Sequence, residues 1–274
     1  MTADPAAELH TIIDLIRYGA SRFNAAGLTF GHSYDNALDE ATQLTLHALH
    51  MPHDLSPVYG NARITEAEKE DVLGLFLRRI EERIPAAYLT GEAWFAGLSF
   101  KSDPRALVPR SPIAELIESG FQPWLGDREV RRALDLCTGS GCIAIACAKE
   151  FPDAVVDASD LSLDALSVAA INVEHHDLQE RVGLLESDVF SKLPGQRYDL
   201  IVSNPPYVDA EDMADLPEEF LREPEMGLAS GADGLDITKR ILAEAADYLT
   251  EDGVLVVEVG NSQWALEQTF PDVP

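Results

Sequence analysis

Residues 134–144 read LDLCTGSGCIA, an apolar run that leads into two closely spaced glycines and then into further apolar residues. Gly139 and Gly141 permit a tight turn and let a ligand come close to the backbone. The stretch therefore predicts a strand, a ligand-binding turn and a helix in direct succession. Its spacing, GxGxxA, also fits dinucleotide sites, so the turn alone does not identify the ligand.

Strands and helices alternate from this stretch onward. Apolar runs predict strands at 133–137, 154–160, 182–188, 198–204 and 253–260. Helical patterns lie between them at 141–150, 163–176 and 235–249. Such alternation over short turns indicates an α/β fold with a parallel sheet covered on both faces, whose ligands bind beyond the carboxyl ends of the strands.

The N-terminal part of the chain has a different pattern. Apolar residues recur at helical spacing, and Thr65-x-x-Glu68 is a capping box at the start of one helix. Further on, apolar residues between Thr90 and Arg110 flank the turn signal Ser102–Pro104, which predicts a β-hairpin that turns there.

These patterns divide the chain into three parts. We expect a small helical domain over 1–88, a β-hairpin linker over 89–111 and the α/β domain over 112–274. The last part ends at FPDVP, where we expect its final strand pair to be missing.

The charge of the chain is strongly acidic. It has 20 Lys and Arg against 48 Asp and Glu, a formal net charge of −28. Such a field repels phosphate backbones and favours a basic protein or a cationic small molecule, so direct specific binding to nucleic acid is not expected. The N-terminus has no basic leader, and no apolar run approaches the roughly 20 residues of a membrane helix, so we expect a cytoplasmic protein without membrane contact.

Cysteines and histidines do not predict a metal site. Three cysteines lack CxxC spacing and lie on an apolar stretch, which predicts small buried side chains: Cys137, Cys142 and Cys147. Three histidines straddle a helix end, which predicts a solvated helix terminus: His47, His50 and His53.

Three aspartates end the first three predicted strands, at Asp135, Asp160 and Asp188. A dinucleotide would bring its pyrophosphate close to Asp135 and be repelled, whereas S-adenosylmethionine carries a sulfonium and an ammonium and has no phosphate. Asp160 can accept hydrogen bonds from both hydroxyls of a ribose. Asp188 can accept from an adenine amino group, with Val189 or Phe190 against the ring. The alternative is that the aspartates only cap helices.

The fourth predicted strand ends in SNPPYV, residues 203–208. Pro205 and Pro206 fix two φ angles and lack N–H groups, so the corner is stiff and offers acceptors. The side-chain oxygen of Asn204 and the carbonyl of Pro205 match the two hydrogens of a planar NH2 group, and Tyr207 can stack on its flat face. Two such acceptors favour the lone-pair-bearing form of a poorly nucleophilic nitrogen. The corner therefore predicts methylation of an NH2 group positioned about 3 Å from the methyl donor.

These residues resemble the N-methyltransferases that carry the D/N/S-PP-Y/F signature. AAYLTGEAWFAGLSF, DLCTGSGCIAIA, SNPPYVDAEDM and VLVVEVGNSQ are similar to the branch that methylates glutamine side chains of proteins. Within it, VPRSP at 108–112 is similar to the enzymes that act on ribosomal protein L-three, whereas those acting on release factors typically carry IPRPDTE there.

The resemblance implies a class I Rossmann-like methyltransferase domain that uses S-adenosylmethionine, with a small N-terminal helical domain for recognition of a basic ribosomal protein. It implies cofactor binding by Asp135, Thr138, Gly139, Ser140, Gly141, Asp160, Leu161, Asp188, Val189 and Asn204. It implies substrate binding by Asn204, Pro205, Pro206 and Tyr207, with Asn204, Pro205 and Tyr207 as catalytic residues. Methylation of release factors, methylation of adenine in nucleic acid and a non-catalytic cofactor-binding module remain alternatives.

Overall fold

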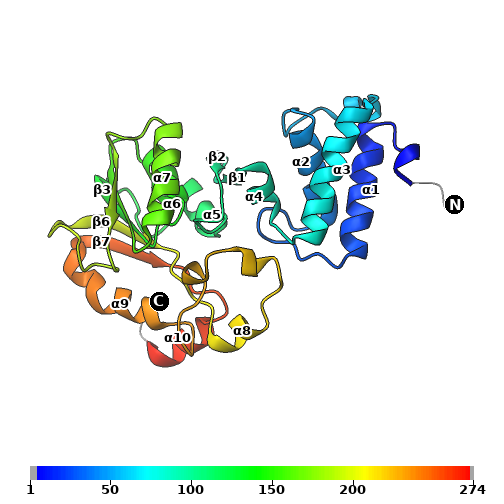
Figure 1. Cartoon of the computed structure of the whole chain (residues 1–274). Coiled ribbons are helices and arrows are strands. Elements are labelled where there is room, and N and C mark those ends of the chain that lie inside the picture. Colours follow the sequence, from blue (N-terminus) through cyan, green and yellow to red (C-terminus); the bar gives the residue numbers. More distant parts are fainter. Residues whose placement is uncertain (1–4, 272–274) are drawn as a thin grey trace. The chain divides into compact units, whose positions relative to one another are not determined.

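The computed structural model describes residues 5–271 and divides into two compact units (Figure 1). The first contains the residues up to Gly91 together with Pro217–Arg222, and the second contains Glu92–Leu216 and the residues from Glu223 onward. The sequence predicted a helical domain in one continuous piece. The sequence of Pro217–Arg222 gives no local signal that these six residues belong to the helical unit.

The first unit, the helical unit, consists of three longer helices and several short ones around an apolar core. Its elements are η1 (Pro5–Glu8), α1 (Ile12–Ala25), α2 (Ala37–Ala48), η2 (Pro57–Asn61), α3 (Glu66–Glu81), α4 (Ala86–Thr90) and η3 (Phe220–Arg222). The capping box predicted at Thr65 is present at the start of α3, and Thr11 forms a second one at the start of α1. The core is made of the buried faces of the three long helices: Leu15 and Phe23, Ala41 and Leu44, and Val72 and Phe76.

Arg79 of α3 is fully buried in the helical unit. Its Nε donates to Glu40 Oε1 at 2.7 Å, Nη1 to Glu219 Oε1 at 3.2 Å and Nη2 to the carbonyl of Thr29 at 2.9 Å. Arg83 donates to the same oxygen of Glu219 at 3.2 Å. The segment Pro217–Arg222 is therefore held in the helical unit by charge-assisted hydrogen bonds to a buried guanidinium.

The hairpin turns before the Ser102–Pro104 signal at which the sequence predicted its turn. Strands β1 (Glu92–Phe95) and β2 (Leu98–Lys101) pair antiparallel, with Phe95 opposite Leu98. The turn is Ala96–Gly97, with φ of 46° and 70°, the two positive values that a two-residue hairpin turn requires. The signal Ser102–Pro104 does lead into a turn, in which the N–H of Ala106 donates to the carbonyl of Asp103 at 3.2 Å, but this turn follows β2 and is not the turn of the hairpin. Asp103 also accepts from the backbone N–H of Arg105 in the loop after β2.

The second unit contains a five-stranded sheet in the order β5-β4-β3-β6-β7. Its strands are β3 (Arg132–Leu136), β4 (Val155–Asp160), β5 (Val182–Glu186), β6 (Tyr198–Ser203) and β7 (Leu249–Val257), and every neighbouring pair is parallel. The remaining elements of this unit are α5 (Ile113–Glu118), α6 (Cys142–Glu150), α7 (Leu163–His175), α8 (Ala210–Ala214), η4 (Glu225–Gly227), α9 (Asp236–Tyr248) and α10 (Gln263–Thr269). The prediction of an α/β fold with a parallel sheet is confirmed.

Both faces of this sheet are covered. Ala133 and Leu200 contribute to a core formed with α5 and α6, whereas Leu134 and Ile201 contribute to one formed with Ile241 of α9. In Figure 1, α6 and α9 accordingly flank the sheet on different sides. Because the chain leaves β3 in one direction to β4 and returns on its other side to β6, the crevice at the carboxyl end of β3 is the expected place for a ligand.

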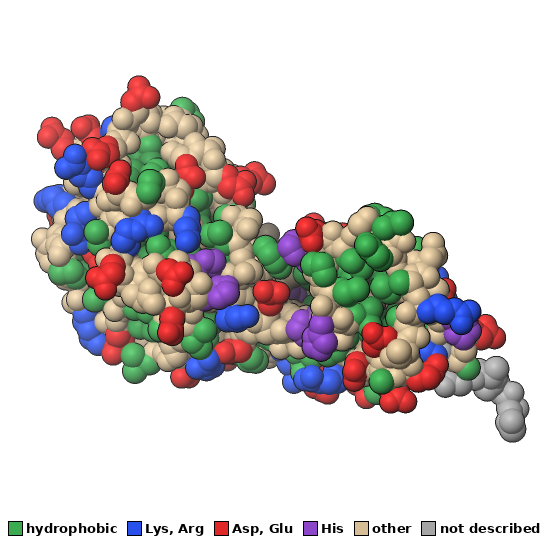
Figure 2. Space-filling model, turned by 90° about the horizontal axis from the view of Figure 1, so that it is seen from above, with side chains coloured by type: hydrophobic (Ala, Val, Ile, Leu, Met, Phe, Trp, Pro, Cys, Tyr) green, Lys and Arg blue, Asp and Glu red, His purple; other side chains and the backbone are tan. Residues whose placement is uncertain are grey.

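Within residues 5–271, no helix combines the length and apolar character that crossing a membrane requires. Figure 2 shows acidic and basic side chains interspersed over one face of the second unit, and hydrophobic side chains gathered on a face of the helical unit.

We predict that Arg79→Ala destabilises the protein by about 3–5 kcal/mol, because it leaves the carboxylate of Glu40 buried without its guanidinium partner and removes one of the two guanidinium partners of Glu219. The neighbouring Arg78 is half-exposed and pairs with Glu82 at 3.5 Å, so Arg78→Ala should change stability by less than about 1 kcal/mol. Urea unfolding followed by circular dichroism measures both. Equal losses in the two variants would contradict a structural role for the buried cluster.

Candidate functional site

The glycine turn lies between β3 and α6 and has the geometry that its sequence predicts. Gly139 and Gly141 have φ of 54° and 81°, in the left-handed region that favours glycine. A Cβ on Gly141 would lie 3.2 Å from the Cβ of Ala169 in α7, so this glycine permits close packing of α6 and α7. A Cβ on Gly139 would meet nothing within 4 Å, which leaves its backbone open to a ligand.

Asp135 is buried at the end of β3, just before this turn. Its Oδ2 accepts from Thr138 Oγ1 at 2.5 Å and from the backbone N–H of Ala144 at 3.1 Å, while its buried Oδ1 has no hydrogen-bond partner among residues 5–271. Burial raises the pKa of Asp135 to about 7, although the two hydrogen bonds oppose the shift. An unpartnered buried acceptor costs about 1–3 kcal/mol, which a cationic or hydrogen-bond-donating ligand can offset.

Asp160 ends β4, beside the glycine turn. One of its oxygens accepts from the N–H of Gly139 at 2.8 Å and the other from the N–H of Ser162 at 2.9 Å. Burial raises the pKa of Asp160 against these hydrogen bonds. Each carboxylate oxygen has a second lone pair, so the group can also accept from two hydroxyls of a ligand. The following residue, Leu161, is 53% exposed and offers apolar surface at the same strand end.

The residues after β5 are arranged differently from what the sequence suggested. Asp188 is half-exposed and pairs with Arg240 of α9 at 2.8 Å. Val189 and Phe190 are buried in the core, where the ring of Phe190 stacks on Tyr248 at 4.5 Å. Neither side chain therefore forms an exposed platform for a ligand ring. Val189 has a φ of 50°, a strained value for a β-branched residue, next to the crevice.

The corner after β6 is held on both sides. The amide nitrogen of Asn204 donates to the carbonyl of Arg110 at 3.5 Å, which leaves its side-chain oxygen to accept from another group. The hydroxyl of Tyr207 donates to Glu258 Oε1 at 3.1 Å, and Ser262 Oγ donates to the carbonyl of Tyr207 at 2.9 Å. Burial raises the pKa of Tyr207 to about 12, so the phenol stays protonated near neutral pH.

Sequence reasoning missed two residues of this region, Glu258 and Arg240. Glu258 follows β7 and accepts from both Tyr207 and Ser111, and burial raises the pKa of its carboxyl. It is an acidic residue at the carboxyl end of a strand, the same signal that singled out the three aspartates. Arg240 lies on a helix and carries no comparable signal in the sequence.

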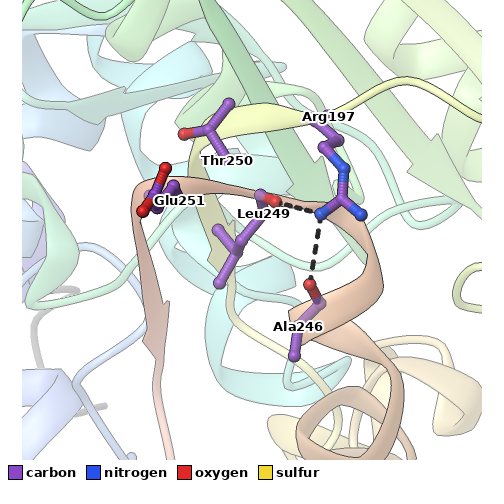
Figure 3. Close-up of a pocket in the computed structure, with 6 residues that line it drawn as sticks. Arg197, Ala246, Leu249, Thr250 and Glu251 are labelled. Atoms are coloured by element: carbon purple, nitrogen blue, oxygen red, sulfur yellow. Dashed lines mark hydrogen bonds between the residues drawn. The ribbon is translucent and has the colours of Figure 1, made fainter.

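The sheet brings these groups to one edge. Asp135, Asp160, Asn204 and Glu258 lie at or directly after the carboxyl ends of β3, β4, β6 and β7. Figure 3 shows a hollow near the opposite edge, where β6 and β7 begin. There, Arg197 donates to the carbonyls of Leu249 at 2.6 Å and Ala246 at 3.5 Å, so its guanidinium stabilises the end of α9. We therefore place the candidate site at the carboxyl edge.

A family model and curated proteins that are similar to this chain are all described as methyltransferases. Residues 121–234 match the family model of the methyltransferase small domain. The whole chain is 66% identical, over 275 residues, to a protein of Xanthomonas campestris pv. campestris named ribosomal protein uL3 glutamine methyltransferase, and it covers 88% of that protein. The whole chain is also 63% identical to the protein of the same name from Xylella fastidiosa, of which it covers 87%.

Two solved structures of the hMettl16 catalytic domain, each in complex with a 3′UTR hairpin, share the fold. One is 17% identical, with 95% of this chain and 84% of that chain covered and a TM-score of 0.51. The other is 19% identical, with 77% and 75% covered and a TM-score of 0.50. At these identities the likeness concerns the fold alone.

We predict that Asp135→Asn stabilises the ligand-free protein at pH 8. The pKa of Asp135 is raised on folding from 3.8 to about 7, so the folded protein binds the proton more tightly and stability falls as the pH rises between these values. Removing the charge should therefore raise the free energy of unfolding at pH 8 by on the order of 1–3 kcal/mol, and by less at pH 5. Urea unfolding at both pH values measures this, with the exposed Asp153→Asn as control. A less stable Asp135→Asn at pH 8 would refute the explanation.

Proposed function

The chain belongs to the family of ribosomal protein uL3 glutamine methyltransferases, and we propose that it transfers a methyl group from S-adenosylmethionine to the side-chain amide nitrogen of a glutamine in ribosomal protein L3. The observation that carries the proposal is the corner after β6. Asn204 is oriented there by the carbonyl of Arg110 so that its own oxygen can accept, close along the chain to the carbonyl of Pro205. These are acceptors for the two hydrogens of a primary amide.

The residues around the glycine turn fit S-adenosylmethionine. Asp135 has a buried oxygen without a partner in the described part of the chain, which suits a donor of positive charge and disfavours a phosphate. Asp160 has two acceptor positions for a ribose diol, and the exposed Leu161 offers apolar contact. We assign binding of the cofactor to Asp135, Thr138, Gly139, Ser140, Gly141, Asp160, Leu161, Asp188 and Asn204, and to Val189 through its main chain. When bound, S-adenosylmethionine supplies a methyl group on a positively charged sulfur: the N–C bond to the amide nitrogen forms as the S–C bond breaks, S-adenosylhomocysteine leaves, and the amide releases one proton to water.

In this reaction the corner works by orientation and not by strong base catalysis. An amide nitrogen is a weak nucleophile because its lone pair is delocalised into the carbonyl. The two N–H groups of the amide donate hydrogen bonds to the oxygens of Asn204 and Pro205. These hydrogen bonds favour the form of the amide in which the lone pair is localised on nitrogen, and they strengthen as the reaction proceeds. Tyr207 stays protonated with its hydroxyl donating to Glu258, so its oxygen is not the base, and we assign its ring to contact with the substrate. Pro206 keeps the corner stiff, which lowers the entropy lost on binding.

The acidic charge supports a basic protein as the substrate. With a net charge of −28 the chain repels nucleic acid and attracts a basic ribosomal protein, whose methylation would take place in the cytoplasm. We assign recognition of this protein to the helical unit. It includes the segment Pro217–Arg222, which begins ten residues after Tyr207, and it exposes large apolar side chains such as Val58, Tyr59 and Leu77.

The test is transfer of labelled methyl from S-adenosylmethionine to three parallel acceptors: free ribosomal protein L3, a peptide-release factor and DNA. Fragment mass spectrometry then locates the label. Label on a glutamine of L3 supports the proposal, whereas label on the release factor alone would assign the chain a different protein substrate. Label on DNA alone would refute glutamine methylation.

We predict that Asn204→Ala lowers kcat for L3 by roughly 100-fold, because one of the two amide acceptors is lost. Affinity for S-adenosylmethionine should change less than kcat, because Asn204 is only one of the ten residues assigned to the cofactor and the carboxylates at the ends of β3 and β4 are untouched. Steady-state kinetics and calorimetry measure the two quantities. A variant that turns over like the wild type would exclude the acceptor role.

Asp160→Ala should have the opposite profile. Loss of the ribose acceptor should weaken affinity for S-adenosylmethionine by on the order of 10- to 100-fold, with a smaller effect on kcat at saturating cofactor. Asp160→Asn keeps one acceptor oxygen and should fall between the wild type and the alanine variant. Calorimetry decides the matter, since unchanged affinity in Asp160→Ala would remove Asp160 from the cofactor site.

A further inference from the structure

We propose that Glu258 is a positioning residue for methyl transfer, which holds Tyr207 and the segment 108–111 in the arrangement that the substrate amide requires. The inference rests on the proposed function and extends it to a residue that does not itself touch the substrate.

The carboxylate of Glu258 joins three segments that are far apart in the chain. Its Oε1 accepts from the hydroxyl of Tyr207 at 3.1 Å and its Oε2 accepts from Ser111 Oγ at 2.5 Å. The backbone N–H of Glu258 donates to the carbonyl of Ser203 at 3.0 Å, directly before Asn204. The end of β7, the corner after β6 and the segment before α5 therefore converge on one side chain.

The ring of Tyr207 is fixed by the chain that follows Glu258. A Cβ on Gly260 would lie 2.5 Å from Cε2 of the ring, so the ring packs directly against the backbone at this glycine. Ser262 Oγ donates to the carbonyl of Tyr207 at 2.9 Å. The backbone at Gly260 thus limits where the ring of Tyr207 can lie, and the hydrogen bond to Glu258 orients the hydroxyl end of that ring.

The second oxygen of Glu258, Oε2, influences Asn204 through Ser111 and the neighbouring Arg110. Ser111 follows Arg110, whose carbonyl accepts from the amide nitrogen of Asn204. The guanidinium of Arg110 binds Glu223 through two hydrogen bonds, at 2.7 and 2.6 Å, and Val108 N–H donates to the same carboxylate at 3.0 Å. This bidentate pair holds the segment at one end, and the Ser111–Glu258 hydrogen bond holds it at the other.

A carboxylate suits this place because both groups that face it are hydroxyl donors. The hydroxyl of Ser111 already accepts from the N–H of Ile113 at 3.1 Å and so donates to Glu258. Glutamine has the same shape but only one acceptor oxygen, so Glu258→Gln must lose or reverse one of the two hydrogen bonds. The backbone at 258 and the cofactor residues on β3 and β4 remain as they are.

The experiment compares Glu258→Gln, Tyr207→Phe and the double variant with the wild type, with L3 as acceptor. We expect each single variant to lower kcat by about 10- to 100-fold, as small displacements of a reacting group do, with little change in affinity for S-adenosylmethionine. The combined loss in the double variant should be smaller than the product of the two single losses, because Tyr207 and Ser111 bind the same carboxylate and form one hydrogen-bond network. Glu251→Gln, an exposed glutamate of the same strand, is the matched control and should equal the wild type.

Gly260→Ala provides a second route that leaves the carboxylate in place. The φ of Gly260 is outside the left-handed region, so alanine is compatible with the backbone while its methyl group displaces the ring of Tyr207. It should reproduce the loss in kcat with unchanged cofactor affinity.

Three outcomes would overturn the inference: wild-type kcat in Glu258→Gln, independent losses that multiply in the double variant, or a loss of cofactor affinity that matches the loss of kcat. Absence of transfer to L3 by the wild type is a different result, which would refute the proposed function itself.

Discussion

The candidate site depends on the parallel pairing of β3 with both β4 and β6. Because all three strands run in the same direction, their carboxyl ends meet at one edge of the sheet. Asp135 and Asn204 are 69 residues apart in the sequence, with Asp160 between them, yet the sheet brings the three segments together. The pairing of β6 with β7 adds Glu258 to the same edge. The chemistry therefore follows from strand order, and each contributing segment needs only to end in a suitable polar residue.

This edge is less favourable energetically than the rest of the sheet. Asp135 is buried with one oxygen that has no partner among the residues that the structure describes, and burial raises the pKa of both Asp135 and Asp160. Cys137 and Val189, next to the ends of β3 and β5, have positive φ angles that such residues seldom adopt. Strained dihedrals and desolvated carboxylates gather where a ligand is expected to bind, and the apolar contacts of the two sheet faces offset their cost. The arrangement is typical of a site whose polar groups are organised before the ligand arrives.

The helical unit includes a segment from the second half of the chain. Glu219 lies in Pro217–Arg222 and shares one carboxylate oxygen between Arg79 and Arg83. This segment follows the corner at Tyr207 by only ten residues, and β1 follows the helical unit directly. The unit to which we assign recognition of the substrate protein is thus covalently continuous, through a short stretch, with the residues proposed to bind the glutamine. The return of this segment to the helical unit depends on the buried ion pair between Arg79 and Glu219.

The sequence by itself determined the local structure and the chemistry of single segments. Glycines 139 and 141 predict the turn, Thr65 and Glu68 predict a helix start, and the proline pair predicts a stiff corner, because each effect arises within a few residues of backbone. Only the tertiary structure decided which segments meet. The hairpin turns at Ala96–Gly97 and not at the Pro104 signal, because the pairing of β1 with β2 sets the register, and the signal forms a separate turn after β2. The partners Arg79–Glu219, Asp188–Arg240 and Tyr207–Glu258 are 140, 52 and 51 residues apart, and such pairs form only when packing of distant segments brings them within hydrogen-bonding distance.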